Sequence, residues 1–156
     1  MHVKIVSVGR LKSGPERTLF DDYRSRFDKL GKVLGIRPLE IIELDDRKVS
    51  GKAGEADLIL RALSNDIYAI ALDERGVQMC SPKFSQLMSQ SRDDGHNALA
   101  FVIGGADGLH HSISDRCQKS LSLGTMVWPR TLARVMLSEQ LYRAATILAG
   151  TPYHRA

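Results

Sequence analysis

The chain has 156 residues, of which 43% are hydrophobic and 26% charged, and its net charge is +4. This length and balance suit one domain spanning residues 1–156 and are too short for two generous domains. The opening residues contain neither the apolar core of a signal peptide nor a run of membrane-spanning length, so we expect a cytoplasmic protein that does not contact a membrane.

The first elements are predicted from a β-rich run and from helix-start residues. Residues 3–8 are rich in β-branched side chains and predict a strand. Ser13 as a cap and Pro15 in the first turn predict a helix that continues at helical spacing to residue 30. A second apolar run over 36–44 predicts another strand.

The rest of the chain continues this alternation of strand and helix. Residues 45–54 are polar and predict the one flexible loop. The remaining elements are expected as a helix over 56–63, a strand over 67–72, a helix over 81–88, a strand over 98–103, a short strand within 121–128 and a helix over 131–149. Such alternation predicts an α/β fold, in which a mostly parallel sheet carries helices on both faces.

The turns after the third, fourth and fifth expected strands form the candidate site. In parallel sheets ligands bind at the carboxyl ends of strands, which places residues 72–76, 104–108 and 124–129 together. Three glycines within 104–108 allow the backbone to approach a ligand closely. Their spacing is not that of a dinucleotide fingerprint, and no phosphate-loop lysine follows. A tight turn without a ligand is the alternative interpretation.

Basic residues outnumber acidic residues two to one in the last third of the chain, whereas the first part is almost balanced. Residues 1–57 carry 12 Lys and Arg against 10 Asp and Glu, whereas residues 101–156 carry six against three. A basic segment beside the candidate turns suits a polyanionic substrate such as RNA. Ordinary surface charge is the alternative, because a dedicated nucleic-acid binder is usually more basic.

The cysteines and histidines do not indicate a metal centre. Cys80 and Cys117 are the only cysteines, and the pair His110-His111 completes no zinc-binding spacing. We therefore expect no metal and two reduced thiols.

The last third of the chain also resembles a known enzyme family. The resemblance is carried by Ile103-Gly104-Gly105 with Gly108-Leu109, Leu121-Ser122-Leu123, Pro129, Leu132-Ala133-Arg134, residues 139–144, and the closing Pro152-Tyr153-His154-Arg155. These strings resemble the large-subunit ribosomal RNA pseudouridine N3-methyltransferases, which belong to the SPOUT or α/β-knot methyltransferases. The match is most specific over residues 101–156, and length and strand order fit the family over the whole chain.

The resemblance implies a cofactor and an assembly. Similar proteins are homodimers whose C-terminal segment forms a trefoil knot, with S-adenosylmethionine held among the knot loops. The cofactor-binding residues implied for this chain are Leu72, Gly104, Gly105, Gly124, Thr125, Met126, Val127, Trp128 and Pro129. Their backbone groups suit the adenine and ribose, and Leu72 and Met126 supply apolar walls. Core packing is the alternative for Met126 and Trp128.

The implied reaction transfers a methyl group to N3 of a pseudouridine in 23S rRNA. This transfer needs the donor and acceptor atoms in line and a group that removes the N3 proton. His154 is the candidate proton acceptor, because histidine titrates near neutral pH. Tyr153 is the candidate for stacking on the base or hydrogen-bonding its edge, and Arg155 is the candidate for holding phosphate or a carbonyl oxygen. A tail that only packs on a partner subunit is the alternative.

Two positions depart from the pattern of the family. Arg130 stands where many relatives have a histidine, and Ala106 stands where a proline is common. Arg130 therefore suggests contact with RNA phosphate, and Arg134 and Arg143 on the following helix are expected to extend that surface. Solvated helix-face residues are the alternative for Arg134 and Arg143.

Three functions from different classes remain compatible with the sequence. The favoured one is the rRNA methyltransferase, acting on the large subunit or the 70S ribosome, since 156 residues leave no room for an appended RNA-binding domain. The second keeps the fold and cofactor but methylates tRNA. The third is a ribosome-associated or dimerisation module without activity, which titration with S-adenosylmethionine would separate from both enzymes.

Overall fold

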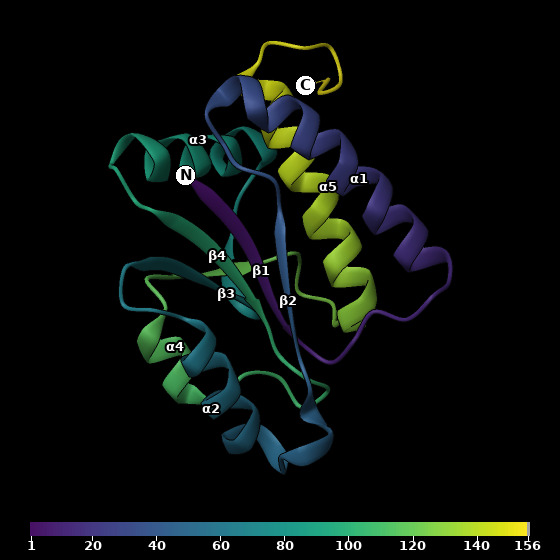
Figure 1. Ribbon diagram of the computed structural model, residues 1–156, viewed down its shortest axis with the longest axis vertical. Coiled ribbons are helices and arrows are strands. Elements are labelled where there is room, and N and C mark those ends of the chain that lie inside the picture. Colours follow the sequence, from purple (N-terminus) through teal and green to yellow (C-terminus); the bar gives the residue numbers. More distant parts are fainter. Residues whose placement is uncertain (156) are drawn as a thin grey trace.

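A five-stranded parallel sheet forms the centre of the computed structural model, which describes residues 1–155 (Figure 1). The strands lie in the order β2-β1-β4-β3-β5, and every pairing between neighbours is parallel. The elements along the chain are β1 (His2–Val8), α1 (Pro15–Gly31), the 3-10 helix Lys32–Leu34, β2 (Glu40–Leu44), the 3-10 helix Asp46–Lys48, α2 (Gly51–Ala62), β3 (Ile67–Gln78), α3 (Ser81–Asp93), β4 (Ala98–Ile103), α4 (His111–Arg116), β5 (Lys119–Ser122) and α5 (Arg130–Leu148).

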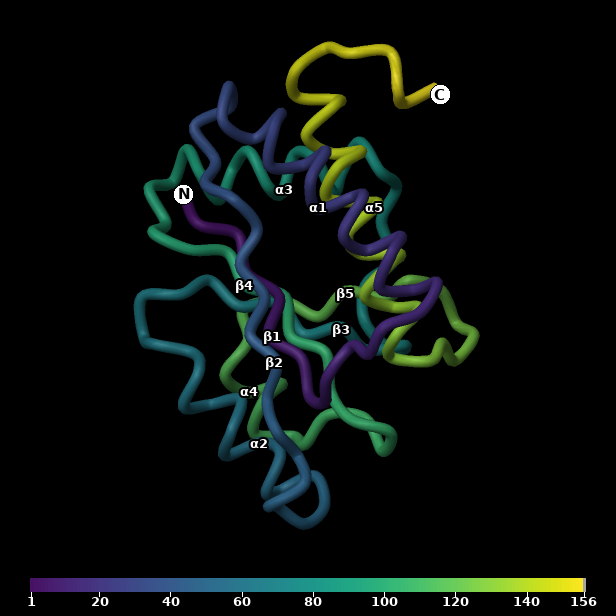
Figure 2. Tube along the Cα trace, turned by 45° about the vertical axis from the view of Figure 1, so that its right-hand side comes forward, coloured from purple at the N-terminus to yellow at the C-terminus, as the bar shows by residue number. Residues whose placement is uncertain are grey.

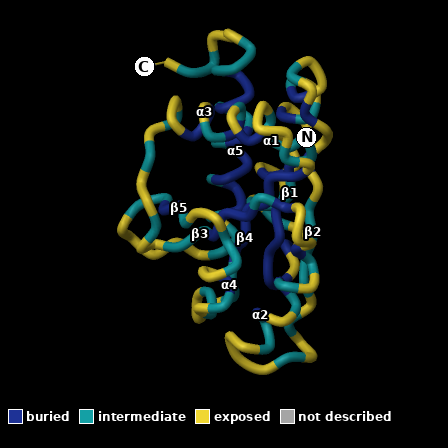
Figure 3. The backbone as a smooth tube through the Cα atoms, turned by 90° about the vertical axis from the view of Figure 1, so that its left-hand side faces the viewer, coloured by how far each residue is buried: buried dark blue, intermediate teal, exposed yellow. Residues whose placement is uncertain are grey.

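The two central strands are almost wholly buried, as Figure 3 shows in dark blue. All six residues of β4 are buried, and Val6 of β1 pairs with Ile42 on one side and Val102 on the other. Near-continuous apolar strands are what a parallel sheet covered on both faces requires, because neither face meets water.

Helices cover both faces of the sheet (Figures 1 and 2). Helices α1, α3 and α5 pack together on one face, over a core that includes Phe27, Phe101 and Leu141. Helices α2 and α4 pack on the other face, over a second core that includes Ile59 and Val102. The predicted α/β class, with a parallel sheet between two helical layers, is confirmed.

Several predicted boundaries differ from the structure. Helix α1 begins at Pro15 as predicted, but Gly14 is its N-cap and Ser13 does not cap it. The strand expected over 36–44 begins only at Glu40. The loop expected over 45–54 instead contains a 3-10 helix and the start of α2 at Gly51.

Two further differences lie near the candidate site. The six-residue helix α4 was not predicted, since one and a half turns are too short for a periodic pattern to show. The short strand expected within 121–128 is β5, which begins earlier, at Lys119, and ends at Ser122, so residues 123–129 are a loop. Gly124 has φ +125°, a conformation that breaks a strand and that residues with a Cβ rarely adopt.

Strand β3 is interrupted close to the carboxyl edge of the sheet. Leu121 of β5 pairs with both Leu72 and Val77 of β3, so residues 73–76 lie outside the ladder as a bulge. A Cβ at Gly76 would lie 2.7 Å from the Leu121 carbonyl carbon, so only glycine fits beside β5 there. The bulge therefore leaves the sheet at the edge where the candidate turns lie.

The C-terminal tail and the segment before α5 lie at opposite ends of that helix (Figure 1). Helix α5 has 19 residues, which at 1.5 Å per residue makes it about 28 Å long. Residues 149–155, here named the tail, follow its far end, whereas 123–129 precede its first turn. The trefoil knot implied by the family stays a prediction.

Candidate active site

A cavity of about 980 Å³ opens at the carboxyl edge of the sheet. It lies between the bulge of β3, the glycine turn after β4 and the segment before α5, which are the three turns chosen from the sequence. We name it the glycine-turn cavity, and its lining is Lys52, Leu72–Arg75, Ile103–Leu109, Leu121, Leu123, Gly124, Met126–Thr131 and Ala133. This volume lies at the upper end of the range typical of small-molecule sites.

The glycine turn is held by contacts that leave no room for larger residues. A Cβ at Gly104 would lie 3.0 Å from the Gly108 carbonyl oxygen, and Gly108 has φ +78°. The Gly108 amide donates to the Gly105 carbonyl at 3.2 Å, and the Gly105 amide donates to Glu55 of α2 at 3.3 Å. Helix α2 therefore supports the turn from outside the cavity.

The segment 123–129 forms the opposite wall and is anchored at its start. The Ser122 hydroxyl accepts from the Gly124 amide at 3.1 Å and lies 3.0 Å from the Glu74 carbonyl oxygen. Beyond this anchor the side chains are open to solvent, since Met126 is 70% exposed and Trp128 40% exposed. The alternative that Met126 and Trp128 are core residues is therefore wrong.

Nearly all the residues expected to bind the cofactor line this cavity. Its lining includes Leu72, Gly104, Gly105, Gly124, Met126, Val127, Trp128 and Pro129, and omits only Thr125. Charged residues that were not predicted also line it: Lys52, Asp73, Glu74, Arg75 and Asp107. Four of these five lie in the turns that strand order had already placed at this edge, but Lys52 comes from α2 and left no signal in the sequence.

The tail lies against the end of α5 and is held by Glu139. The Tyr153 hydroxyl donates to Glu139 at 3.0 Å, and the same carboxylate accepts from Arg143 Nε at 3.0 Å. The Arg143 guanidinium lies over the Tyr153 ring at 4.8 Å from its centroid, and the ring of Tyr142 is 4.6 Å from that of Tyr153. Burial and the bond to Glu139 raise the pKa of Tyr153 well above its usual value, so this phenol is a hydrogen-bond donor at neutral pH.

The ring of His154 has a defined hydrogen-bonding partner. Arg143 Nη1 lies 3.4 Å from His154 Nδ1, and because a guanidinium only donates, Nδ1 must be the acceptor. In the neutral ring the proton is therefore on Nε2. Glu139, which organises this cluster, was missed, although its spacing of four residues from Arg143 is a recognisable helical ion-pair signal.

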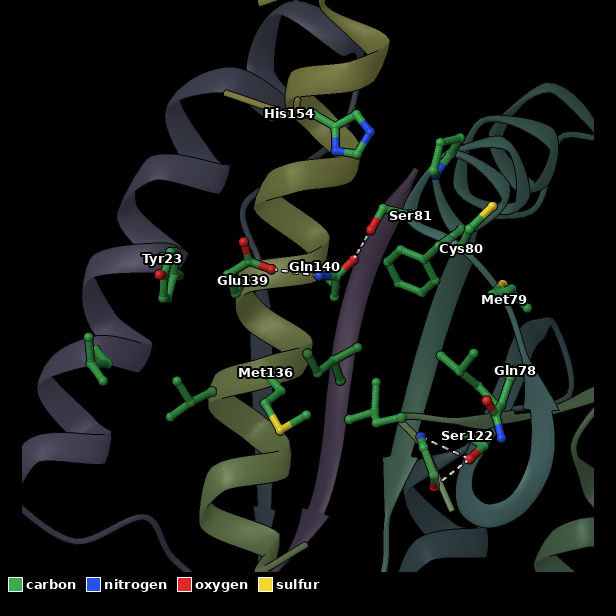
Figure 4. A pocket seen from close by; sticks show the side chains of 18 residues that line it. Tyr23, Gln78, Met79, Cys80, Ser81, Ser122, Met136, Glu139, Gln140 and His154 are labelled. Carbon is green, nitrogen blue, oxygen red and sulfur yellow. Dashed lines mark hydrogen bonds between the residues drawn. The ribbon is translucent and has the colours of Figure 1, made fainter. Parts of the chain in front are cut away.

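His154 lies at one end of a groove between α1, α3 and α5 (Figure 4). The groove has a volume of about 830 Å³ and is mostly apolar, with Tyr23 on one side and Cys80 and Ser81 on the other. Ser81 donates to Gln140 at 2.8 Å across it. No residue of the tail lines the glycine-turn cavity, although the groove that His154 lines shares Leu121, Leu123 and Gly124 with that cavity.

The three arginines expected to bind RNA have different surroundings. Arg130 is at the rim of the cavity, 38% exposed, and pairs with Asp46 at 3.5 Å. Arg143 is held by Glu139 and lies beside the tail. The expectation that Arg134 extends a surface is wrong, and so is helix-face solvation, because its side chain is 1% exposed and bonds to Glu43. Burial lowers the pKa of Arg134, and the Glu43 carboxylate opposes this shift.

Two general findings concern metals and membranes. Within residues 1–155, no group of three or more His, Cys, Asp or Glu side chains is arranged to hold a metal ion. No helix in this described part of the chain has both the length and the apolar character needed to cross a membrane.

Comparison with known proteins gives matches along nearly the whole chain. A family profile described as "Predicted SPOUT methyltransferase" matches residues 1–154. Two relatives, from Dinoroseobacter shibae and Ruegeria pomeroyi, are each named Ribosomal RNA large subunit methyltransferase H. They are 54% and 52% identical to this chain over 155 residues, and each alignment covers 99% of this chain and 99% of the relative.

The solved structures agree with the fold. A probable methyltransferase from Bordetella pertussis Tohama I matches with a TM-score of 0.55 over 92% of this chain and 93% of that chain, at 16% identity. At this identity the likeness supports the fold alone, whereas the family profile and the close relatives settle the assignment. The chain belongs to the SPOUT methyltransferase family, within the group named Ribosomal RNA large subunit methyltransferase H.

Proposed function

We propose that this protein is an S-adenosylmethionine-dependent methyltransferase that methylates N3 of a pseudouridine in 23S rRNA, on the large subunit or the 70S ribosome. The observation that carries the proposal is the end-to-end match to relatives named Ribosomal RNA large subunit methyltransferase H. The glycine-turn cavity supports it, because the residues that the family implies for the cofactor line one space.

The glycine-turn cavity fits S-adenosylmethionine in size and chemistry. Leu72, Met126 and Val127 offer apolar surface to an adenine, and the glycine turn brings backbone groups to the cavity wall without side chains in between. When bound, S-adenosylmethionine supplies an activated methyl group. The protein's own task is then to orient the acceptor base, exclude water and accept one proton.

The active site is completed by a second copy of the chain. The tail folds back along the second half of α5, where Tyr153 donates to Glu139, and no residue of the tail lines the glycine-turn cavity of its own subunit. A tail that keeps its contacts with Glu139 therefore stays outside that cavity. The exposed apolar residues Met126 and Val127 beside the cavity are a surface that a partner subunit would cover. A homodimer that pairs the cavity of one subunit with the tail of the other satisfies both observations.

The tail residues act on the pseudouridine. Tyr153 presents a phenol that stays protonated and a ring that can stack on a base. His154 has its accepting nitrogen directed at Arg143, so it presents Nε2–H, and it becomes a proton acceptor when Nδ1 leaves Arg143. Arg155 follows at the end of the tail, where its guanidinium can bind a phosphate in two-pronged geometry.

Basic residues near the two halves of the site bind the RNA backbone. Arg130 at the rim of the cavity contacts phosphate, with its bond to Asp46 exchanged for the RNA. Arg143 is fixed beside the tail and contributes positive charge there. The protein acts as one domain over residues 1–156, in the cytoplasm, without a metal ion or a membrane.

Methyl transfer to three RNA sources tests the proposal. Labelled S-adenosylmethionine is incubated with purified ribosomes, free rRNA and tRNA from a strain that lacks the protein, and the nucleosides are analysed by mass. Methylated pseudouridine on ribosomes is the expected result. Label on tRNA would mean that the substrate is tRNA and not 23S rRNA. Tight binding of S-adenosylmethionine without methyl transfer to any of the three RNA sources would contradict the proposed activity.

A further inference from the structure

The largest fully buried side chain of the described residues is an arginine one turn into α5. Arg134 is 1% exposed, and its Nη2 donates to the carbonyl oxygens of Val8 and Gly9 at 3.1 and 2.6 Å. Its Nη1 donates to Glu43 Oε1 at 3.0 Å. We name these four residues the arginine clasp. Burying a guanidinium is costly unless its donors are met, and here Nη1 and Nη2 have three acceptors while the buried Nε has none. A side chain kept buried at this cost indicates a specific role.

The arginine clasp joins three segments that are distant in sequence. Val8 and Gly9 lie where β1 ends, Glu43 lies near the end of β2, and Arg134 lies in α5. Glu43 Oε1 also accepts from the Leu11 amide at 2.7 Å, so one carboxylate holds both the chain leaving β1 and the helix. The position of the first turn of α5 is thereby fixed relative to the sheet.

A second arginine lies over the same glycine. Gly9 has φ +81°, a conformation that favours glycine, and a Cβ there would lie 3.0 Å from Arg130 Cζ, so a larger residue would also displace the Arg130 side chain. Arg130 also pairs with Asp46, which follows β2. The first turn of α5 is therefore held to the ends of β1 and β2 from inside by Arg134 and at the surface by Arg130.

This same turn continues into the wall of the glycine-turn cavity. Arg130, Thr131 and Ala133 line the cavity, together with most of the segment 123–129 that precedes them. None of the four clasp residues lines it. The clasp thus acts on the cavity from behind, through the backbone of α5.

We propose that the arginine clasp is a positioning device that places the wall formed by residues 123–131 and thereby sets the affinity for S-adenosylmethionine. The inference rests on the proposed function in one respect, that this cavity takes S-adenosylmethionine. Arg134 is then a positioning residue and has no contact with RNA. Small displacements of positioning groups weaken such sites strongly, because the ligand must match several walls at once.

Binding of S-adenosylmethionine to conservative clasp variants tests this inference. Arg134→Lys keeps the charge but cannot reach three acceptors, and we expect it to raise the Kd for S-adenosylmethionine on the order of tenfold or more. Glu43→Gln keeps the oxygen acceptor and loses the charge, so its effect should have the same direction and be smaller. In methyl transfer, KM for S-adenosylmethionine should rise more than kcat falls.

A matched variant separates positioning from general stability. Met88→Ala empties a fully buried site on α3, and Met88 belongs to neither the clasp nor the cavity lining, so the substitution lowers the melting temperature without removing a contact of either. We expect its Kd for S-adenosylmethionine to stay within about twofold of the wild-type value while the protein is folded.

The outcomes distinguish this inference from the proposed function. Folded clasp variants that bind S-adenosylmethionine as tightly as the wild type would overturn the inference alone. An equal loss of binding in Met88→Ala would overturn it as well, since the effect would then follow stability. Failure of the wild-type chain to bind S-adenosylmethionine would contradict the proposed function and remove the inference with it.

Discussion

Two inactive variants should restore methyl transfer when they are combined in one dimer. Gly105→Trp damages the cavity, because even a Cβ at Gly105 would lie 2.6 Å from Glu55 Oε2, and an indole forces the glycine turn or α2 to move. His154→Ala removes the imidazole from the tail and leaves the cavity intact. His154 does not line the cavity that contains Gly105, and Gly105 does not line the groove that contains His154, so neither substitution removes a lining residue of the other half of the site.

The size of the recovery follows from counting sites. A heterodimer of the two variants has one site with both substitutions and one site with neither, so it should work at about half the wild-type rate per dimer. In an equal, unsorted mixture about half of the dimers are heterodimers, and the recovery falls to about one quarter.

The reciprocal pairing is the matched control. A wild-type chain paired with a chain that carries both substitutions has one damaged component in each site, and this heterodimer should be inactive. A site contained within one chain gives the opposite pair of results, with no recovery in the first heterodimer and about half the rate in the second. The assay is methyl transfer to ribosomes by heterodimers purified through two different affinity tags. That opposite pair of results, in verified heterodimers, would refute the shared site.

Three further predictions concern the tail, the cavity wall and a buried thiol. Glu139→Ala removes the acceptor that holds Tyr153 and Arg143, so kcat should fall on the order of tenfold or more. Calorimetry should give an unchanged Kd for S-adenosylmethionine. An equal loss of kcat in Glu139→Gln would instead attribute the effect to the negative charge of Glu139. Trp128 is the only tryptophan and lines the cavity, so binding of S-adenosylmethionine should change the intrinsic fluorescence of the protein. Trp128→Phe should abolish that change in fluorescence without abolishing binding. An unchanged wild-type spectrum at saturating S-adenosylmethionine would argue against this cavity as the binding site. Burial raises the pKa of the Cys117 thiol from 9.0 to about 11. As pH rises, the thiol is therefore deprotonated in the unfolded chain before it is deprotonated in the folded chain. The stability that the thiol contributes below pH 9 is lost as pH rises through 11. The difference in urea midpoint between the wild type and Cys117→Ala should therefore shrink over that range, and a constant difference would contradict the shift.

Strand and helix order was predictable because the apolar pattern is strong where the sheet is buried on both faces. The strand over 98–103 was predicted with its observed bounds, since every one of its residues is buried and apolar. From that order alone, the rule that ligands bind at carboxyl ends placed the three turns that line the cavity. The individual cofactor residues came from the resemblance to the family, and most of them lie in this one space.

The sequence carried no signal for contacts between distant side chains. In the sequence Arg134 looks like any surface arginine on a helix, and only the fold brings its guanidinium to the carbonyls of Val8 and Gly9, more than a hundred positions earlier. Glu55 is equally hidden, because its bond to the Gly105 amide joins α2 to a turn fifty residues away. The position of the tail also required the structure, since it depends on the bond from Tyr153 to Glu139 and on the contact between Arg143 and His154.

The bulge in β3 gives the cavity a wall that can change shape without cost to the sheet. Leu121 pairs with β3 on both sides of residues 73–76, so the ladder closes above and below them whatever conformation they take. Amides of the bulge should therefore exchange with deuterium quickly, while those of Ala71 and other ladder residues exchange only when the sheet opens. Apart from Gly76, which must stay glycine beside β5, a segment anchored in this way also tolerates changes of sequence, so it is the place where the cavity can be reshaped for a different ligand while the fold is kept.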